Sequence, residues 1–332
     1  MDIFIPKKLK DFIINKEIAL QLNNFNKKNI LNTLIYGSRN SGKKTLIKAL
    51  LNSIYDIDID KISQINTFDL KIGNNKVSIT YTSSPYHFEI NLYEYGLYDK
   101  NIITEFILDL IKFKNIKLGC FKIIILNHFE CVSSNAQMLL KRMFEKHTNA
   151  RFFLISEQIS KVDNCLLSRC FCVRIQTPNK IELTNYIDQI ANKYSINDNI
   201  IKKIDKNYNL FLINNILINS IHNLNFDFEE VLKLDQSINK IINLINKKNI
   251  NSILEIRTIC YNLLLLNLGV DFVFKKIVNH YLNSNLNDSK KILILNAASD
   301  TNKILKNVEH NLISLEYFIL KVKKILYKVL NK

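Results

Sequence analysis

A glycine-rich segment that ends in lysine and threonine carries the clearest chemistry in the chain. Its residues are Gly37, Ser38, Arg39, Asn40, Ser41, Gly42, Lys43, Lys44 and Thr45. Glycines let backbone N–H groups curl around a phosphate, a helix N-terminus adds positive potential, and Lys43 can neutralise phosphate oxygens. The segment follows a strand-like run and opens a helix-like run, which is the setting such a loop requires. It predicts nucleotide or phosphate binding; the alternative is a purely structural turn.

Positions around this loop lack the groups that hydrolysis needs. In active P-loop NTPases, a Ser or Thr after the loop lysine and an Asp after a second strand hold Mg²⁺. Here Lys44 follows the loop lysine, and the apolar run Ile123–Leu126 leads into Asn127 and His128. The imidazole of His128 could act as a base, with a structural role as the alternative. We therefore expect a site that holds ATP or ADP, has no metal ligands for Mg²⁺ and hydrolyses poorly.

Alternating strand and helix patterns position this loop. The predicted strands are Thr33–Tyr36, Lys76–Tyr81, His87–Ile90, Lys122–Leu126, Phe152–Ile155 and Cys172–Ile175. Helical spacing covers Lys43–Ser53, Glu105–Phe113 and a segment from Ser133 or Ser134 to about His147. A nearly continuous apolar run such as Lys122–Leu126 is typical of a buried parallel strand. The first half therefore predicts an α/β, doubly wound fold built on a mostly parallel sheet.

The pattern becomes wholly helical after Pro178. The three helices predicted next are Ile181–Tyr194, Asn197–Lys206 and Leu210–His222. Four or five longer helices follow from about Glu229, and the last is predicted over Leu312–Leu330. We expect three domains: a nucleotide-binding core over 1–178, a small helical lid over 179–227 and a helical C-terminal domain over 228–332.

Composition bounds the class of protein without naming a function. The 332 residues are 47% hydrophobic and 23% charged with only 6 Gly and 3 Pro, values that exclude wholesale disorder and collagen-like chains. The net charge of +16 comes mostly from Lys, so it is weak evidence for a nucleic-acid partner. The six cysteines lack zinc spacing, the N-terminus lacks a secretory signal, and no apolar run reaches membrane length. We expect a reduced intracellular protein with no membrane partner.

Six further segments resemble those of one family. They are Tyr86–Asn91, Asn135–Gln137, Leu140–Lys146, Ser168-Arg169-Cys170, Leu254–Arg257 and Leu315–Phe318. Together with Gly42-Lys43-Lys44-Thr45, and in this order, they resemble the replication factor C small subunits of AAA+ clamp loaders. Within that family the resemblance is to the subunit with a degenerate ATPase site, counted third in humans and fifth in yeast.

The resemblance implies a fold and a role. It implies an AAA+ core, a lid and an α-helical collar, with the collars of five subunits forming a ring. The assembly would use ATP to open a sliding clamp and close it around primer–template DNA, in the nucleus or at a viral replication site in host cytoplasm. This subunit's own site would be idle, and Arg169 would reach a neighbour's ATP as an arginine finger, which stabilises charge on the transferred phosphoryl group. The alternative for Arg169 is an ordinary surface arginine.

The resemblance also assigns roles to residues outside the loop. Gln137, Lys141 and Arg142 would lie on a helix near the central channel and contact DNA phosphates or a neighbouring subunit; the alternative is a solvated helix face. At two further positions where the family senses the γ-phosphate, this chain has Glu157 and Phe211. Both add to the degenerate set that already holds Asn127 and His128.

Two other functions stay open at this point. One is an active P-loop NTPase with an unorthodox site that uses His128. The other is a stand-alone DNA-binding or scaffold protein whose P-loop is vestigial.

Overall fold

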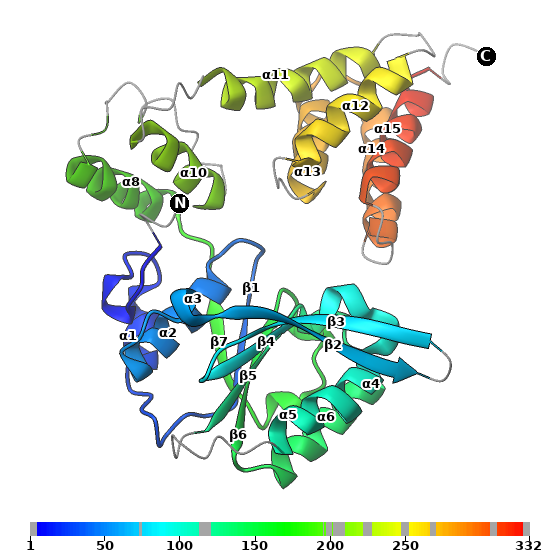
Figure 1. The fold of residues 1–332 in the computed structure, drawn as a ribbon. Coiled ribbons are helices and arrows are strands. Elements are labelled where there is room, and N and C mark those ends of the chain that lie inside the picture. The colour runs from blue at the N-terminus through cyan, green and yellow to red at the C-terminus, as the bar shows by residue number, and fades with distance from the viewer. Residues whose placement is uncertain are drawn as a thin grey trace. The chain divides into compact units, whose positions relative to one another are not determined.

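The chain folds into two compact units, Met1–Leu224 and Asn225–Lys332 (Figure 1). The structure is a computed structural model. It describes residues 5–72, 75–112, 121–194, 196, 201, 210–221, 228–246, 252–265, 270–305 and 311–327. Each unit is described below by itself.

One seven-stranded sheet organises the first unit. Its strands are β1 (Thr33–Gly37), β2 (Gln64–Ile72), β3 (Asn75–Ser83), β4 (His87–Asn91), β5 (Lys122–Asn127), β6 (Ala150–Ser156) and β7 (Phe171–Ile175). The spatial order is β2-β3-β4-β5-β6-β1-β7. Strands β4, β5, β6, β1 and β7 run parallel to one another, and β3 pairs antiparallel with both β4 and β2. The predicted α/β fold with a mostly parallel sheet is confirmed.

Helices cover both faces of the sheet. They are α1 (Lys16–Leu22), α2 (Lys43–Tyr55), α3 (Ile59–Ile62), α4 (Asp99–Asn101), α5 (Leu108–Lys112), α6 (Ser134–Lys146) and α7 (Asn164–Leu167). A π-helical segment, Ile102–Ile107, joins α4 to α5, and short 3₁₀ turns lie at Leu9–Asp11, Leu92–Tyr98, Phe129–Cys131 and Ile159–Lys161. The predicted helix over Glu105–Phe113 therefore begins earlier, at Asp99, while Phe113 lies outside the described residues.

The core divides into two apolar layers because neighbouring residues of a strand point to opposite faces. On β5, Ile124 packs in the layer that contains Phe106 and Leu140 of the α4–α6 side. The next residue along the strand, Ile125, packs in the layer that contains Leu46 and other residues of α1 and α2. A strand buried on both faces explains why Lys122–Leu126 is almost continuously apolar.

The edge strand β2 was not predicted. Thr67–Ile72 alternates polar and apolar residues, a local strand signal, whereas Gln64–Asn66 departs from it and Ile65 is largely exposed at the sheet edge. Its pairing with β3 runs from Gln64 opposite Ser83 to Ile72 opposite Asn75. The strand is therefore one arm of a hairpin whose second arm, β3, was predicted.

Two helices of the predicted lid belong to the first unit. They are α8 (Lys180–Tyr194) and α10 (Leu210–Ile221), and the hydroxyl of Tyr186 donates to Asn214 Oδ1 across them at 2.7 Å. The predicted helix Asn197–Lys206 lies almost wholly outside the described residues. The boundaries of a separate lid stay a prediction.

The second unit is helical throughout its described residues. Its helices are α11 (Phe228–Ile245), α12 (Ser252–Leu265), α13 (Val270–Asn283), α14 (Asp288–Leu305) and α15 (Asn311–Tyr327). Phe274 and Phe318 pack with ring centroids 4.3 Å apart, and Arg257 of α12 donates two hydrogen bonds to the Glu316 carboxylate of α15. Within the described part of the chain, no helix is long and apolar enough to cross a membrane.

Gly37 closes β1 where that strand meets β7, and this contact gives a stability prediction. A Cβ atom at Gly37 would lie 2.2 Å from the carbonyl oxygen of Ile175. Gly37→Ala should therefore destabilise the protein by about 2 kcal/mol, because the two strands must separate to admit a methyl group. Urea unfolding measures this loss. The control is Gly96→Ala, whose added methyl meets nothing within 4 Å; an equal loss in both variants would contradict the explanation.

Candidate nucleotide site

The loop between β1 and α2 has the backbone form of an anion site. Asn40 and Gly42 both have left-handed backbone angles, with φ of 59° and 90°, and these turn the chain into the helix. Gly42 is the residue that precedes α2, and no side chain caps the helix there. The first N–H groups of α2 therefore keep their positive potential for a ligand.

Two side chains of the loop are buried in a way that suits a phosphate. Lys43 is 8% exposed, and its ammonium donates to the carbonyl oxygens of Gly37 and Ser38 at 2.8 and 2.7 Å. Burial lowers the pKa of Lys43, against the opposing charges of Glu157 and Glu130. Ser41 Oγ is buried and makes no hydrogen bond to any described residue. A phosphate would supply the acceptors that both groups lack.

A cavity of about 590 Å³ opens beside the loop. Ser41, Gly42 and Thr45 form its phosphate-loop side. The N-terminal segment contributes Pro6 and Phe12, and helices α8 and α10 contribute Tyr186, Tyr194 and Asn214. Its volume lies in the usual range for small-molecule sites, and its mixed aromatic and polar lining suits a nucleoside. The other loop residues Ser38, Arg39 and Asn40 are exposed.

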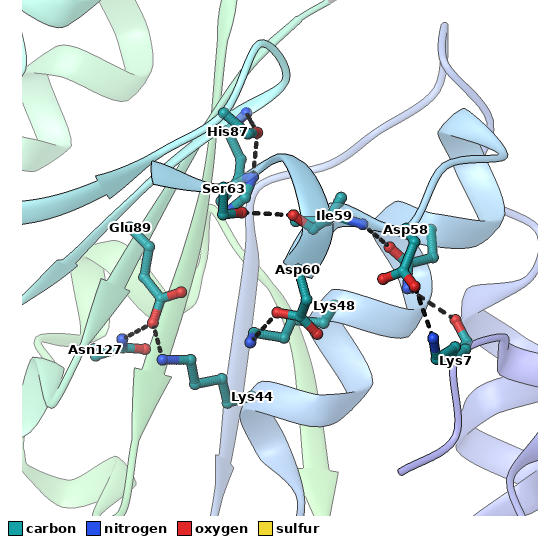
Figure 2. A network of polar contacts seen from close by, with 12 residues as sticks. Lys7, Lys44, Lys48, Asp58, Ile59, Asp60, Ser63, His87, Glu89 and Asn127 are labelled. Atoms are coloured by element: carbon teal, nitrogen blue, oxygen red, sulfur yellow. Dashed lines mark hydrogen bonds and ion pairs between the residues drawn. The ribbon is translucent and has the colours of Figure 1, made fainter. Parts of the chain in front are cut away.

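The two positions that would hold Mg²⁺ are instead joined to each other through Glu89 (Figure 2). Lys44 forms an ion pair with Glu89 Oε1, and Asn127 Nδ2 donates to the same oxygen at 2.5 Å. Mg²⁺ prefers oxygen ligands in octahedral geometry, and the Lys44 ammonium offers only donors. The residues present therefore do not fit the metal that an active P-loop site uses.

His128 and Glu157 both contact the carboxylate of Glu130. His128 Nδ1 lies 3.1 Å from Glu130 Oε1, and the Glu157 N–H donates to Glu130 Oε2 at 2.9 Å. Burial acts to raise the pKa of Glu130, but these two hydrogen bonds outweigh it and lower the pKa. The three side chains offer ligand atoms within 4.8 Å of one another. The set could hold a cation, although its hydrogen bonds already satisfy the Glu130 carboxylate.

Of the three residues predicted on α6, Gln137 is buried and the other two are accessible. The Gln137 amide donates to the carbonyl oxygens of Val132 and Lys161 and accepts from the Asp163 N–H. It is 1% exposed, so in this conformation it fastens α6 to the loop before α7 and cannot touch DNA or a neighbour. The predicted contact of Gln137 with DNA or a neighbour does not fit this buried position. Lys141 is half-buried and Arg142 is exposed.

Arg169 lies on the surface between α7 and β7. Its guanidinium contacts Glu145 Oε1 at 2.9 and 3.1 Å and donates to the Cys165 carbonyl oxygen at 3.0 Å. Its side chain is 37% exposed. The arrangement orients the guanidinium while leaving part of it open to a further ligand.

The remaining degenerate position, Phe211, belongs to α10, and its side chain lies outside the described part of the structure. Three acidic residues in these networks were not assigned site roles from the sequence: Glu89, Glu130 and Glu145. For Glu89 the sequence held one indication of a role: it is the only acidic residue of β4, the strand next to β5. The other two lie on a turn and an exposed helix face, where an acid is ordinary.

Fold and loop together define a class of protein. A mostly parallel sheet flanked by helices, with a phosphate loop between its strand β1 and helix α2, defines a P-loop protein of the α/β class. No protein-family model matches the chain.

Curated relatives of this chain are replication factor C subunits. Replication factor C subunit 5 of Saccharomyces cerevisiae is 25% identical over 348 residues, 97% of this chain and 98% of that protein. A putative replication factor C small subunit of Acanthamoeba polyphaga mimivirus is 29% identical over 95% of this chain and 87% of its own length. A probable replication factor C subunit 3 of Dictyostelium discoideum is 33% identical, but the match spans only 57% of that protein. The chain is therefore similar to replication factor C small subunits over nearly its whole length.

Solved structures align more loosely. A DNA polymerase III gamma subunit-related protein of Thermotoga maritima is 12% identical with a TM-score of 0.47, covering 93% of this chain and 99% of that one.

A buried histidine on β4, His87, predicts a pH dependence of stability. His87, at the start of β4, is 1% exposed and pairs with Ser84 Oγ at 2.6 Å through Nδ1. Burial lowers the pKa of His87 to about 4. Below its ordinary value of 6.5 the unfolded chain takes up a proton that the folded chain refuses, so stability falls as pH drops from 6.5 towards 4.

Between about pH 7 and about pH 5, this histidine should cost about 2 kcal/mol of unfolding free energy. Urea titrations at the two pH values measure the loss. His87→Gln should remove it, whereas His147→Gln, at a position that stays half-buried, should keep it. A wild-type stability that is flat over this range would refute the assignment.

Proposed function

We propose that this chain is a subunit of a clamp loader that opens a sliding clamp and loads it on primer–template DNA. The nearly full-length similarity to replication factor C subunits supports this role. Its partners would be the other subunits of a hetero-pentamer, the clamp and DNA. It would act in the nucleus or at a viral replication site.

Within this role, the chain's own site would bind ATP or ADP and leave it intact. The single observation that carries this proposal is the Lys44–Glu89–Asn127 contact, because it joins both metal-holding positions to each other. The buried Lys43 and the unpartnered Ser41 hydroxyl support binding itself. A site that binds phosphate without Mg²⁺ ligands has lost the main electrostatic source of phosphoryl-transfer catalysis.

Arg169 would act in the site of a neighbouring subunit. Three hydrogen bonds from the guanidinium fix its direction, since its partners are Glu145, the Cys165 carbonyl and the Ser168 hydroxyl. An arginine held in this way loses little conformational freedom when it meets a phosphate. Its planar fork suits the oxygens of a γ-phosphate better than an ammonium does.

The proposal predicts a loss of catalysis in trans. In a reconstituted complex where only the adjoining subunit keeps its P-loop lysine, Arg169→Ala should slow single-turnover ATP hydrolysis by about 10³-fold. Co-purification of the tagged chain with clamp-loader subunits and clamp first establishes the complex. The control is Arg174→Ala, which removes an exposed arginine from the adjacent strand β7.

Two results would count against the role. Normal clamp loading by the Arg169→Ala complex would show that Arg169 is not an arginine finger. Isolation of the chain without clamp-loader partners would favour a stand-alone DNA-binding or scaffold protein.

The idle site predicts the behaviour of the purified chain. We expect no ATP turnover above background, with or without DNA, because the His128 imidazole is engaged by Glu130 and Lys44 stands where a Mg²⁺-holding hydroxyl is needed. His128→Ala should leave this result unchanged. DNA-stimulated turnover that disappears in His128→Ala would instead establish the unorthodox active NTPase.

A further inference from the structure

We propose that this P-loop binds a nucleoside diphosphate without a divalent cation, because the Lys44 ammonium, anchored by Glu89, supplies the positive charge that Mg²⁺ supplies elsewhere. The inference rests on the proposed nucleotide site and adds a property to it. Lys44 and Asn127 stand at the two positions that hold Mg²⁺ elsewhere, and both are bound to Glu89 instead.

The ammonium is held in place by a buried acid. Glu89 is 6% exposed and projects from β4, next to β5 in the parallel register that pairs it with Ile125. Its Oε1 atom receives both Lys44 and Asn127. Asn127 therefore orients the carboxylate, and the carboxylate orients the lysine. A buried acid keeps such partners because losing one would leave its charge uncompensated.

The Lys44 ammonium still has donors to offer. An ammonium carries three N–H groups, and the Lys44 side chain is 54% exposed even though its ion pair ends on a buried oxygen. Figure 2 shows Lys44 extending from the start of α2 towards Glu89. Phosphate oxygens seated on the loop would therefore find a second ammonium beside that of Lys43.

The start of α2 concentrates positive charge. Its first turn contains Lys43 and Lys44 and no acidic residue, although a helix N-terminus disfavours cations. The acids that face these lysines come from other elements: Glu89 pairs with Lys44, and the charges of Glu130 and Glu157 act on Lys43. A divalent cation would add charge of the wrong sign and would have to displace Lys44 from Glu89 to gain a ligand.

A second lysine on α2 offers a matched control. Lys48 lies one turn further along the helix and also forms an ion pair, to Asp60 at 2.5 Å. Figure 2 shows this pair apart from the Glu89 contacts. Lys48→Thr thus removes the same charge and one ion pair from the same helix, outside the phosphate loop.

The experiment is a calorimetric titration of the full-length purified chain with ADP, once in excess Mg²⁺ and once in EDTA. The wild-type dissociation constants in the two conditions should agree within about twofold. Lys44→Thr should weaken binding in EDTA by about tenfold or more, because a hydroxyl replaces the charge. Lys44→Thr combined with Asn127→Asp should bind at least about tenfold more tightly with Mg²⁺ than with EDTA, because it restores the metal-holding pair. Lys48→Thr should match the wild type.

Thermal melts separate these effects from misfolding, and Lys44→Gln gives a second measure. Its amide can still donate to Glu89 but carries no charge, so it should weaken binding in EDTA as Lys44→Thr does. Wild-type affinity of Lys44→Gln for ADP in EDTA would overturn the role of the charge.

The titration distinguishes a failure of the cation-free inference from a failure of the nucleotide site itself. Tight binding of ADP to the wild type only when Mg²⁺ is present would overturn the inference and leave the nucleotide site standing; a cation held by His128, Glu130 and Glu157 would give that result. An absence of ADP binding in both conditions would overturn the nucleotide site itself, and the inference with it.

Discussion

The pairing of β4 with β5 is the constraint on which the site depends. It sets Glu89 in register with Ile125, two residues before Asn127 on the same strand, and so carries a buried carboxylate to within reach of the phosphate loop. A carboxylate in that position needs a positive partner, and Lys44 provides one. The identity of the residue after the loop lysine is thus tied to an acid on a strand three places away from β1 in the sheet.

Much of the architecture follows from local patterns. Apolar runs predicted the five parallel strands, because buried parallel strands are apolar on both faces, and the alternation of Lys76–Tyr81 after a turn signal predicted β3. The strand that was missed, β2, alternates polar and apolar residues over Thr67–Ile72, so its second half did carry a strand signal. Helical spacing predicted the C-terminal unit because each helix buries one stripe of apolar residues.

The site was predictable in its parts but not in its connections. The phosphate loop is contiguous, and its glycines and lysine identify it from spacing alone. By contrast, Glu89, Glu130 and Glu145 act through contacts to residues 2 to 45 positions away in sequence, at distances that only the fold creates. Gln137 was placed near DNA or a neighbour by resemblance alone, and its amide completes buried backbone hydrogen bonds that no local pattern announces.

The two attachments of α6 have a mechanical consequence. Near its N-terminal end, Gln137 is bonded to the backbone of Lys161 and Asp163; near its C-terminal end, Glu145 holds Arg169. Gln137 binds the turn before α7 and Glu145 binds Arg169 just after it, so both ends of α6 are attached to the one segment that bears the guanidinium. A displacement of α6 would therefore reach the guanidinium through these contacts.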